Sequence, residues 1–195
     1  MFLFYRQLLF LFKKWLNTFV TKTGNENLKT SFSKNIRKMK QKKNIAIVAH
    51  DNRKKDIMEW VSFKWQQLVH HDLICTGTTG KLVEETLIEK CRENDAVPPT
   101  VTRLKSGPLG GDQQLGALIV EGAVDILIFF WDPMQPQPHD VDVKALLRIT
   151  VLYNIPTASN RSTADFLVSS SLFHEEYQPI LKDYNAYIKR DVNIS

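Results

Sequence analysis

The chain has 195 residues, 43% hydrophobic and 24% charged, which is the composition of a globular domain with a short appendage. Its net charge of +5 is unevenly spread. Residues 1–43 carry eleven Lys or Arg and one Glu, whereas residues 44–195 carry fifteen basic and twenty acidic side chains. The basic character therefore belongs to the N-terminal piece, and we do not expect the domain to bind nucleic acid.

The N-terminal piece has two parts. Residues 2–20 are apolar and aromatic but are interrupted by Arg6, Lys13 and Lys14, so their longest uncharged run is shorter than the roughly 20 residues of a transmembrane helix. They also lack the small-residue cleavage site of a signal peptide. Residues 21–43 are polar and basic and predict a disordered linker. We expect a dispensable extension, with translation from Met39 and an interfacial helix that contacts a membrane as alternatives.

Cys75 and Cys91 are the two cysteines, and their spacing fits neither a zinc site nor a disulfide framework. Lone cysteines are typical of the reducing cytoplasm, which is the location we expect.

From residue 44 the chain alternates between short apolar runs and stretches with helical spacing. The runs at 44–49, 72–75, 101–104, 125–131 and 156–158 predict strands, and residues 125–131 should lie in the interior of the sheet. Helices are expected at 54–68, 81–91, 113–121, 143–153 and 162–170. This alternation predicts an α/β fold in three layers, a mostly parallel sheet with helices on both faces, in a domain of residues 44–195.

Polar and glycine-rich residues follow four of the predicted strands. Parallel strands place their carboxyl ends at one edge of the sheet, where ligands of open α/β sheets bind. The sequence therefore predicts one site built from several loops. Its candidate residues are His50, Asp51 and Lys54, then Thr76, Gly77, Thr78 and Thr79, then Ser106, Gly107 and Asp112, then Asp132, His139 and Asp142.

Residues 106–114 (SGPLGGDQQ) set a single carboxylate, Asp112, in a glycine-rich loop directly before a helix. Such a loop lets backbone amides approach a small ligand, and Asp112 is a candidate general base. The alternative is that Asp112 only caps the helix.

Residues 76–80 (TGTTG) lack the P-loop pattern, and residues 106–111 lack the dinucleotide-binding order. The threonine segment fits either a phosphate nest or a simple turn and cap. His50 and His139 show no diagnostic metal spacing.

The order of IVAHD at 47–51, TGTTG at 76–80, SGPLGGDQQ at 106–114, FWDP at 130–133 and PHDVDVK at 138–144 resembles methylglyoxal synthase over about residues 44–190. The resemblance implies conversion of dihydroxyacetone phosphate to methylglyoxal and inorganic phosphate, a carbon–oxygen lyase reaction without metal or organic cofactor. It also implies a homohexamer that inorganic phosphate inhibits.

By resemblance, Asp112 is the base, His139 polarises the carbonyl oxygen, and Asp132 and Asp142 orient the site and assist proton movement. The remaining candidates, His50, Asp51, Lys54, residues 76–79, Ser106 and Gly107, would hold the phosphate and the substrate. The family pattern has an arginine near the C-terminus, where Asp191 rather than Arg190 aligns. Because the same fold also serves as a regulatory module that binds phosphate metabolites, that function stays open as the alternative.

Overall fold

The computed structural model describes residues 38–136 and 138–184, and the described residues up to 179 form one compact unit. Its centre is a five-stranded sheet with the order β3-β2-β1-β4-β5, in which every neighbouring pair is parallel. The strands are β1 (Asn44–Ala49), β2 (Asp72–Thr76), β3 (Val101–Leu104), β4 (Ile126–Phe130) and β5 (Thr157–Ala158). The α/β prediction is confirmed, and each strand lies within one residue of its predicted bounds at either end.

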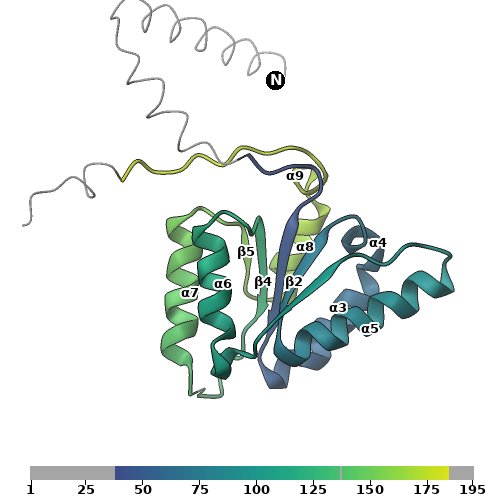
Figure 1. Cartoon of the computed structure of the whole chain (residues 1–195), viewed down its shortest axis with the longest axis horizontal. Coiled ribbons are helices and arrows are strands. Elements are labelled where there is room, and N and C mark those ends of the chain that lie inside the picture. Colours follow the sequence, from purple (N-terminus) through teal and green to yellow (C-terminus); the bar gives the residue numbers. More distant parts are fainter. Residues whose placement is uncertain (1–37, 137, 185–195) are drawn as a thin grey trace, which may run out of the picture. The chain divides into compact units, whose positions relative to one another are not determined.

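Helices cover both faces of the sheet (Figure 1). One face carries α6 (Gly111–Val120) and α7 (Asp140–Leu152), and the other carries α3 (Lys54–Phe63), α4 (Trp65–Leu68), α5 (Gly77–Glu93), α8 (Arg161–Ser169) and α9 (Ser171–His174). A strand buried on both faces cannot alternate polar and apolar residues. This explains why β1 and β4 are almost uniformly apolar and why each face has its own hydrophobic cluster.

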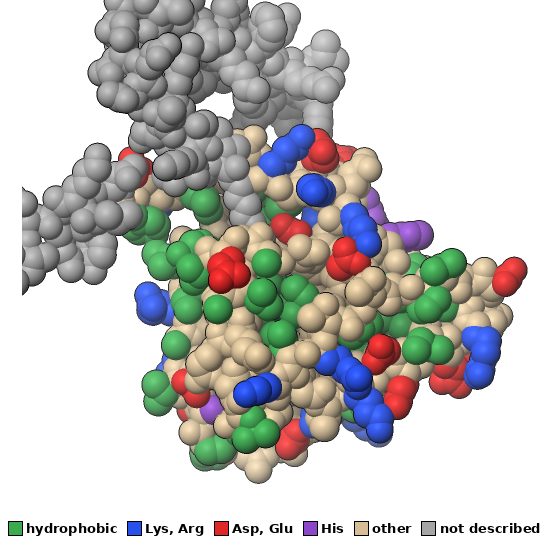
Figure 2. Space-filling view, in the orientation of Figure 1, with side chains coloured by type: hydrophobic (Ala, Val, Ile, Leu, Met, Phe, Trp, Pro, Cys, Tyr) green, Lys and Arg blue, Asp and Glu red, His purple; other side chains and the backbone are tan. Residues whose placement is uncertain are grey.

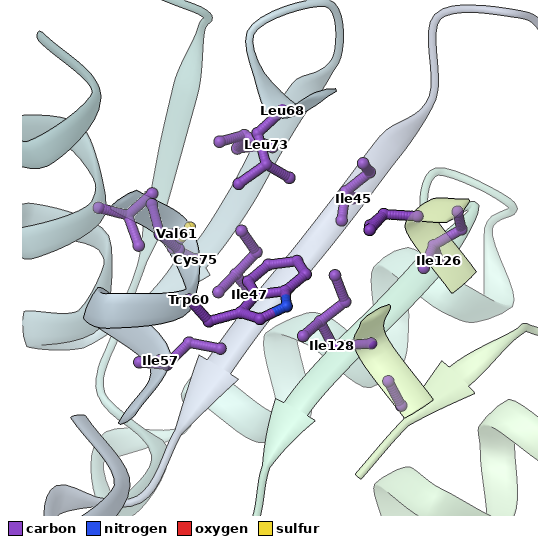
Figure 3. Close-up of a cluster of buried hydrophobic side chains, with 14 of the residues drawn as sticks. Ile45, Ile47, Ile57, Trp60, Val61, Leu68, Leu73, Cys75, Ile126 and Ile128 are labelled. Atoms are coloured by element: carbon purple, nitrogen blue, oxygen red, sulfur yellow. The ribbon is translucent and has the colours of Figure 1, made fainter. Parts of the chain in front are cut away.

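Trp60 anchors the larger cluster. Its fully buried indole lies among Ile47, Ile57 and Ile128 (Figure 3), and its Nε1–H donates to Asp165 Oδ1 of α8 at 3.1 Å. Lys64 Nζ lies 3.1 Å from the same carboxylate oxygen. This contact accompanies a break at Lys64, so the predicted helix 54–68 is wrong in its continuity and forms α3 and α4.

Three helices begin two to four residues earlier than the sequence predicts. The TGTTG segment is the cap and first turn of α5, α6 begins at Gly111, and α7 begins at Asp140. The glycine and acidic residues at these starts resemble loop residues, which explains the late prediction. The correction matters because it places Thr78, Thr79, Asp112 and Asp142 in first helical turns.

Charged side chains are mixed on the face of the described domain seen in Figure 2, where Lys and Arg lie among Asp and Glu rather than in one basic surface. Within residues 38–136 and 138–184, no helix has the length and hydropathy needed to cross a membrane. The predictions for residues 1–37 lie outside the described residues.

Residues 38–43 belong to the domain rather than to a linker, which corrects the prediction for this segment. Met39 is buried and exchanges main-chain hydrogen bonds with Tyr177, at 2.7 and 3.1 Å. Lys43 is also buried, and its Nζ donates to the carbonyls of Lys40 and Glu175. Its main-chain N–H donates to Nδ1 of buried His71 at 3.1 Å. These hydrogen bonds hold residues 38–43 and 175–177 at the edge of the sheet where the strands begin.

His71 should make the domain sensitive to acid. Burial, with the nearby charges of His174 and Lys43, lowers the pKa of His71 to about 4. The unfolded chain, with an ordinary histidine pKa of about 6.5, then binds the proton more readily than the folded domain. This contribution to stability is complete above about pH 6.5 and is lost as the pH falls to about 4.

We therefore expect the free energy of unfolding to fall by about 3 kcal/mol across this range because of His71. Urea unfolding at a series of pH values measures it. His71→Gln, which does not titrate, should flatten the slope by that amount, and an unchanged slope would contradict the assignment.

Candidate active site

A pocket lies at the carboxyl ends of the strands, with about 470 Å³ of empty space that is partly open to solvent. Its walls come from the ends of β1 and β2, the segment after β3, β4 and the start of α7. The lining residues are Val48, Ala49, His50, Asp51, Lys54, Thr76, Gly77, Thr78, Thr79, Ser106, Gly107, Pro108, Asp112, Phe129 and His139. The loops that follow several strands therefore line one pocket.

Asp112 and His139 form a hydrogen-bonded pair on one side of the pocket. Asp112 is 3% exposed, and its Oδ2 lies 2.8 Å from Nδ1 of His139. A carboxylate oxygen only accepts hydrogen bonds, so Nδ1–H is the donor when Asp112 is ionised. The N-cap of α6 is Gly110, and Asp112 makes no capping hydrogen bond. The interpretation of Asp112 as a helix cap is therefore wrong.

Gly107 allows this close contact. A Cβ atom at residue 107 would lie 2.8 Å from Cε1 of His139 and 3.0 Å from Oδ2 of Asp112. Only a residue without a side chain fits beside the pair, which explains why the loop has a glycine here.

His50 lines the pocket and has a buried hydrogen-bond donor. Its Nδ1 accepts the main-chain N–H of Asp132 at 3.2 Å, so the neutral ring carries its proton on Nε2. Nε2 is buried and has no hydrogen-bond partner among the described residues. Burial, and secondarily the charge of His139, lowers the pKa of His50 and favours the neutral ring. A buried N–H without a partner is costly, so a ligand oxygen here would stabilise the site.

The opposite wall is suited to an anion. Lys54 Nζ lies 2.5 Å from Asp51 Oδ1 and also donates to the Thr78 hydroxyl. The Lys54 hydrogen bond and charge lower the pKa of Asp51. The first-turn amides of α5 have no partners within the helix and carry partial positive charge. The Gly77 N–H donates to the Lys105 carbonyl at 3.2 Å. The main-chain N–H groups of Thr78 and Thr79 remain for a ligand.

Gly77 is required by this turn. Its φ is +44°, and a Cβ atom would lie 2.8 Å from the Ser106 Cα. Both constraints exclude larger residues and hold the α5 turn against the segment after β3.

The structure brings eleven of the thirteen predicted site residues to the pocket wall, and the other two lie outside it. Asp132 is buried beneath His50, where Oδ2 accepts from Asn52 at 3.0 Å and Oδ1 accepts from the Met134 N–H at 3.1 Å. The Asn52 hydrogen bond is the main cause of a lowered Asp132 pKa. Asp142 is half-buried in the first turn of α7, where its main-chain N–H donates to the His139 carbonyl.

Sequence reasoning missed the apolar and proline part of the wall, which is Val48, Ala49, Pro108 and Phe129. Phe129 packs edge-to-face on the His50 ring at 5.1 Å. No signal marks it, because β4 is apolar throughout. Within the described residues, no group of three or more His, Cys, Asp or Glu side chains is arranged to hold a metal ion.

Comparisons with known proteins agree with this fold. Residues 56–159 match the family model of the MGS-like domain. Methylglyoxal synthase from Maridesulfovibrio salexigens is 60% identical over 156 residues, which are 78% of this chain and 99% of that protein. The Coxiella burnetii (strain RSA 493) enzyme of the same name is 53% identical over 148 residues, 76% of this chain and 96% of that protein.

A solved structure is also similar. The crystal structure of methylglyoxal synthase from Elizabethkingia anophelis NUHP1 superposes with a TM-score of 0.73 at 48% identity, and the match covers 82% of this chain and 99% of that one. The fold and the matched family model define an MGS-like domain. The chain belongs to the methylglyoxal synthase family.

Gly107→Ala should separate Asp112 from His139. The added methyl group overlaps both side chains, so one must move, and such overpacking costs about 1–3 kcal/mol of stability. A crystal structure of the variant should show the Nδ1 to Oδ2 distance beyond hydrogen-bond range. Gly116→Ala is the matched control, because its Cβ would meet only Ile149 Cδ1 at 3.5 Å. A variant with the pair intact and unchanged stability would contradict the prediction.

Proposed function

We propose that this protein converts dihydroxyacetone phosphate to methylglyoxal and inorganic phosphate, as a carbon–oxygen lyase. The observation that carries the proposal is the arrangement of the pocket. A buried carboxylate paired with an imidazole stands on one side, and helix amides, hydroxyls and a lysine stand on the other. The reaction needs a base at one end of the substrate and an anion site at the other. Family membership supports the same assignment.

Asp112 would be the base. It would remove a proton from the substrate carbon that bears the hydroxyl, and the electron pair would move onto the carbonyl oxygen to form an enediolate. The enediolate would then expel phosphate from the adjacent carbon, which leaves the enol of methylglyoxal. Because Asp112 is 3% exposed, the step takes place away from bulk water, where electrostatic effects are strong.

Two imidazoles would stabilise the oxygen that becomes negative. Because Nδ1–H of His139 donates to Asp112, His139 would polarise the carbonyl through Nε2 when the ring carries a proton on both nitrogens. The unpartnered Nε2–H of His50 would add a second, neutral donor. The two rings lie edge-to-face with centroids 5.7 Å apart, so both can approach one substrate. Donors held ready where charge develops lower the barrier without reorganisation.

The phosphate would bind at the start of α5. Thr78 and Thr79 would offer amides and hydroxyls, Thr76, Gly77, Ser106 and Gly107 complete the cradle, and Lys54 supplies positive charge. Asp51 would hold Lys54 in place. Expulsion of phosphate requires its C–O bond to lie out of the enediolate plane, and a cradle on a different element from the base suits that geometry.

Asp132 and Asp142 would act from outside the pocket wall. We assign Asp132 to the orientation of His50, through the hydrogen bond from its main chain. Asp142, three residues after His139 in the same helical turn, would orient that histidine and assist proton movement.

We further propose a homohexamer in the cytoplasm. The apolar side chains of Leu109, Met134 and Val141 are exposed by 72–85% and support association, because exposed apolar surface often marks an interface. Cys75 and Cys91 are both buried and unpaired, which suits a reducing compartment.

Asp112→Asn tests the reaction and the base together. The variant keeps the side-chain shape but cannot accept the proton, so we expect kcat to fall by at least about 10³-fold while inorganic phosphate still binds. The measurement is the release of methylglyoxal and phosphate from dihydroxyacetone phosphate, with Asp142→Asn as comparison. Full activity in Asp112→Asn would move the base elsewhere. A folded wild type that binds phosphate compounds but releases no product would favour a regulatory module.

The assembly is tested by light scattering on the full chain after gel filtration. We expect a mass six times the 22.5 kDa of one chain. Val141→Asp places a charge on the exposed start of α7 and should lower that mass if this surface is an interface. A monomeric wild type at micromolar concentration would refute the hexamer.

A further inference from the structure

Asn52 is a polar residue outside the pocket wall, and its side-chain amide donates hydrogen bonds to two acceptors. Its Nδ2 donates to Asp132 Oδ2 at 3.0 Å and to Oε1 of Gln135. Neither Asn52 nor Gln135 lines the pocket, and no role in the reaction described above requires the Asn52 side chain. Asn52 is, however, hydrogen-bonded to Asp132, whose main chain contacts His50 of the pocket wall.

Asp132 is the intermediate group. Its carboxylate is held at both oxygens, at Oδ2 by Asn52 and at Oδ1 by the Met134 N–H. The residue is 5% exposed, so this carboxylate lies against the protein rather than in water. Holding the side chain also holds the main chain of the same residue, and the Asp132 N–H donates to His50 Nδ1 at 3.2 Å.

The hydrogen bond at Nδ1 decides whether Nε2 of neutral His50 is a hydrogen-bond donor or an acceptor. A donated N–H at Nδ1 requires a lone pair there, which leaves the proton of the neutral ring on Nε2. Without it, the neutral ring has a second tautomer, with the proton on Nδ1 and a lone pair at Nε2. That lone pair would repel a substrate oxygen that gains negative charge.

We propose that Asn52 is a positioning residue which, through Asp132, keeps His50 in the tautomer that donates from Nε2. This inference rests on the proposed function for its effect on catalysis, but the tautomer itself does not depend on the reaction. Asn52 does not touch the substrate in this arrangement. Replacing the Asn52 side chain changes the tautomer of His50, and turnover changes as a consequence.

The charged groups around the ring allow a distinctive pH signature. His50 faces Asp112, His139, Asp132 and Asp140, its charge also reaches Asp51, and Arg53 lies near Asp132. Below the pKa of His50 the ring is an imidazolium that has a proton on both nitrogens, so tautomer control is irrelevant. Above that pKa the ring is neutral, and tautomer control matters. A variant that loses this control is therefore impaired more at high pH than at low pH.

The test uses Asn52→Ala, Asn52→Asp and the control Gln135→Ala in the full chain. ¹⁵N spectra of histidine-labelled protein report the tautomer and the pKa of His50, with His50→Gln to assign its signals. Wild type should show the Nε2–H tautomer alone. Asn52→Ala should show a mixture and a higher His50 pKa, because the hydrogen bond that favours the neutral ring is weakened. Asn52→Asp, which sets two carboxylates side by side, should show a larger change.

Kinetics on dihydroxyacetone phosphate provides the second measurement. The kcat/KM of Asn52→Ala should be lower than that of wild type by about tenfold at pH 8 and by much less at a pH below the His50 pKa that the ¹⁵N spectra give. The tenfold loss is a part of what complete loss of an oxyanion donor costs. Gln135→Ala should match wild type at both pH values.

Two outcomes would overturn the inference. One is a single Nε2–H tautomer with unchanged pKa in Asn52→Ala, and the other is an equal tautomer change in Gln135→Ala. A wild type without methylglyoxal synthase activity in which Asn52→Ala still changes the His50 tautomer would refute the proposed function and leave the positioning role in place.

Discussion

Parallel pairing of five strands is the constraint on which the remainder of the domain depends. It requires both faces of the sheet to be covered, which β1 and β4 satisfy with apolar runs and the helices with two separate clusters. It also directs every strand toward the same edge. The pocket at that edge is thus a product of topology, since segments far apart in the sequence meet there without a dedicated scaffold.

Within the pocket, tight backbone contacts replace the rigidity that a larger domain would supply. Gly77 packs on Ser106, and Gly107 packs on the Asp112 and His139 pair. The start of α5 is tied to the segment after β3 by the hydrogen bond from Gly77 to Lys105. The wall at the start of α5 and the wall with Asp112 and His139 therefore share the segment after β3. Main-chain contacts rather than mobile side chains set the distance between these two walls.

The sequence predicts the strands and the pocket wall well because both follow from local patterns. Uniformly apolar runs mark β1 and β4, and polar residues after the strands mark the site. The sequence places the helix starts too late because Gly77, Gly111 and Asp140 resemble loop residues. In the structure, Gly77 and Gly111 instead begin helices that pack closely on residues 105–106. The places of Phe129 beneath His50 and of Asp132 behind it depend on packing between β1 and β4, which local patterns do not encode.

Residues 38–43 change where this domain can be cut for protein engineering. A chain shortened to begin at Asn44 would retain the entire sheet and pocket, yet it would lose the N–H that Lys43 donates to His71. Both ring nitrogens of that buried histidine would then lack partners, since Nε2 has none in the described structure. The carbonyl of Glu175 would lose the Lys43 ammonium as well. A truncation chosen by strand boundaries would thus weaken the edge of the sheet farthest from the chemistry.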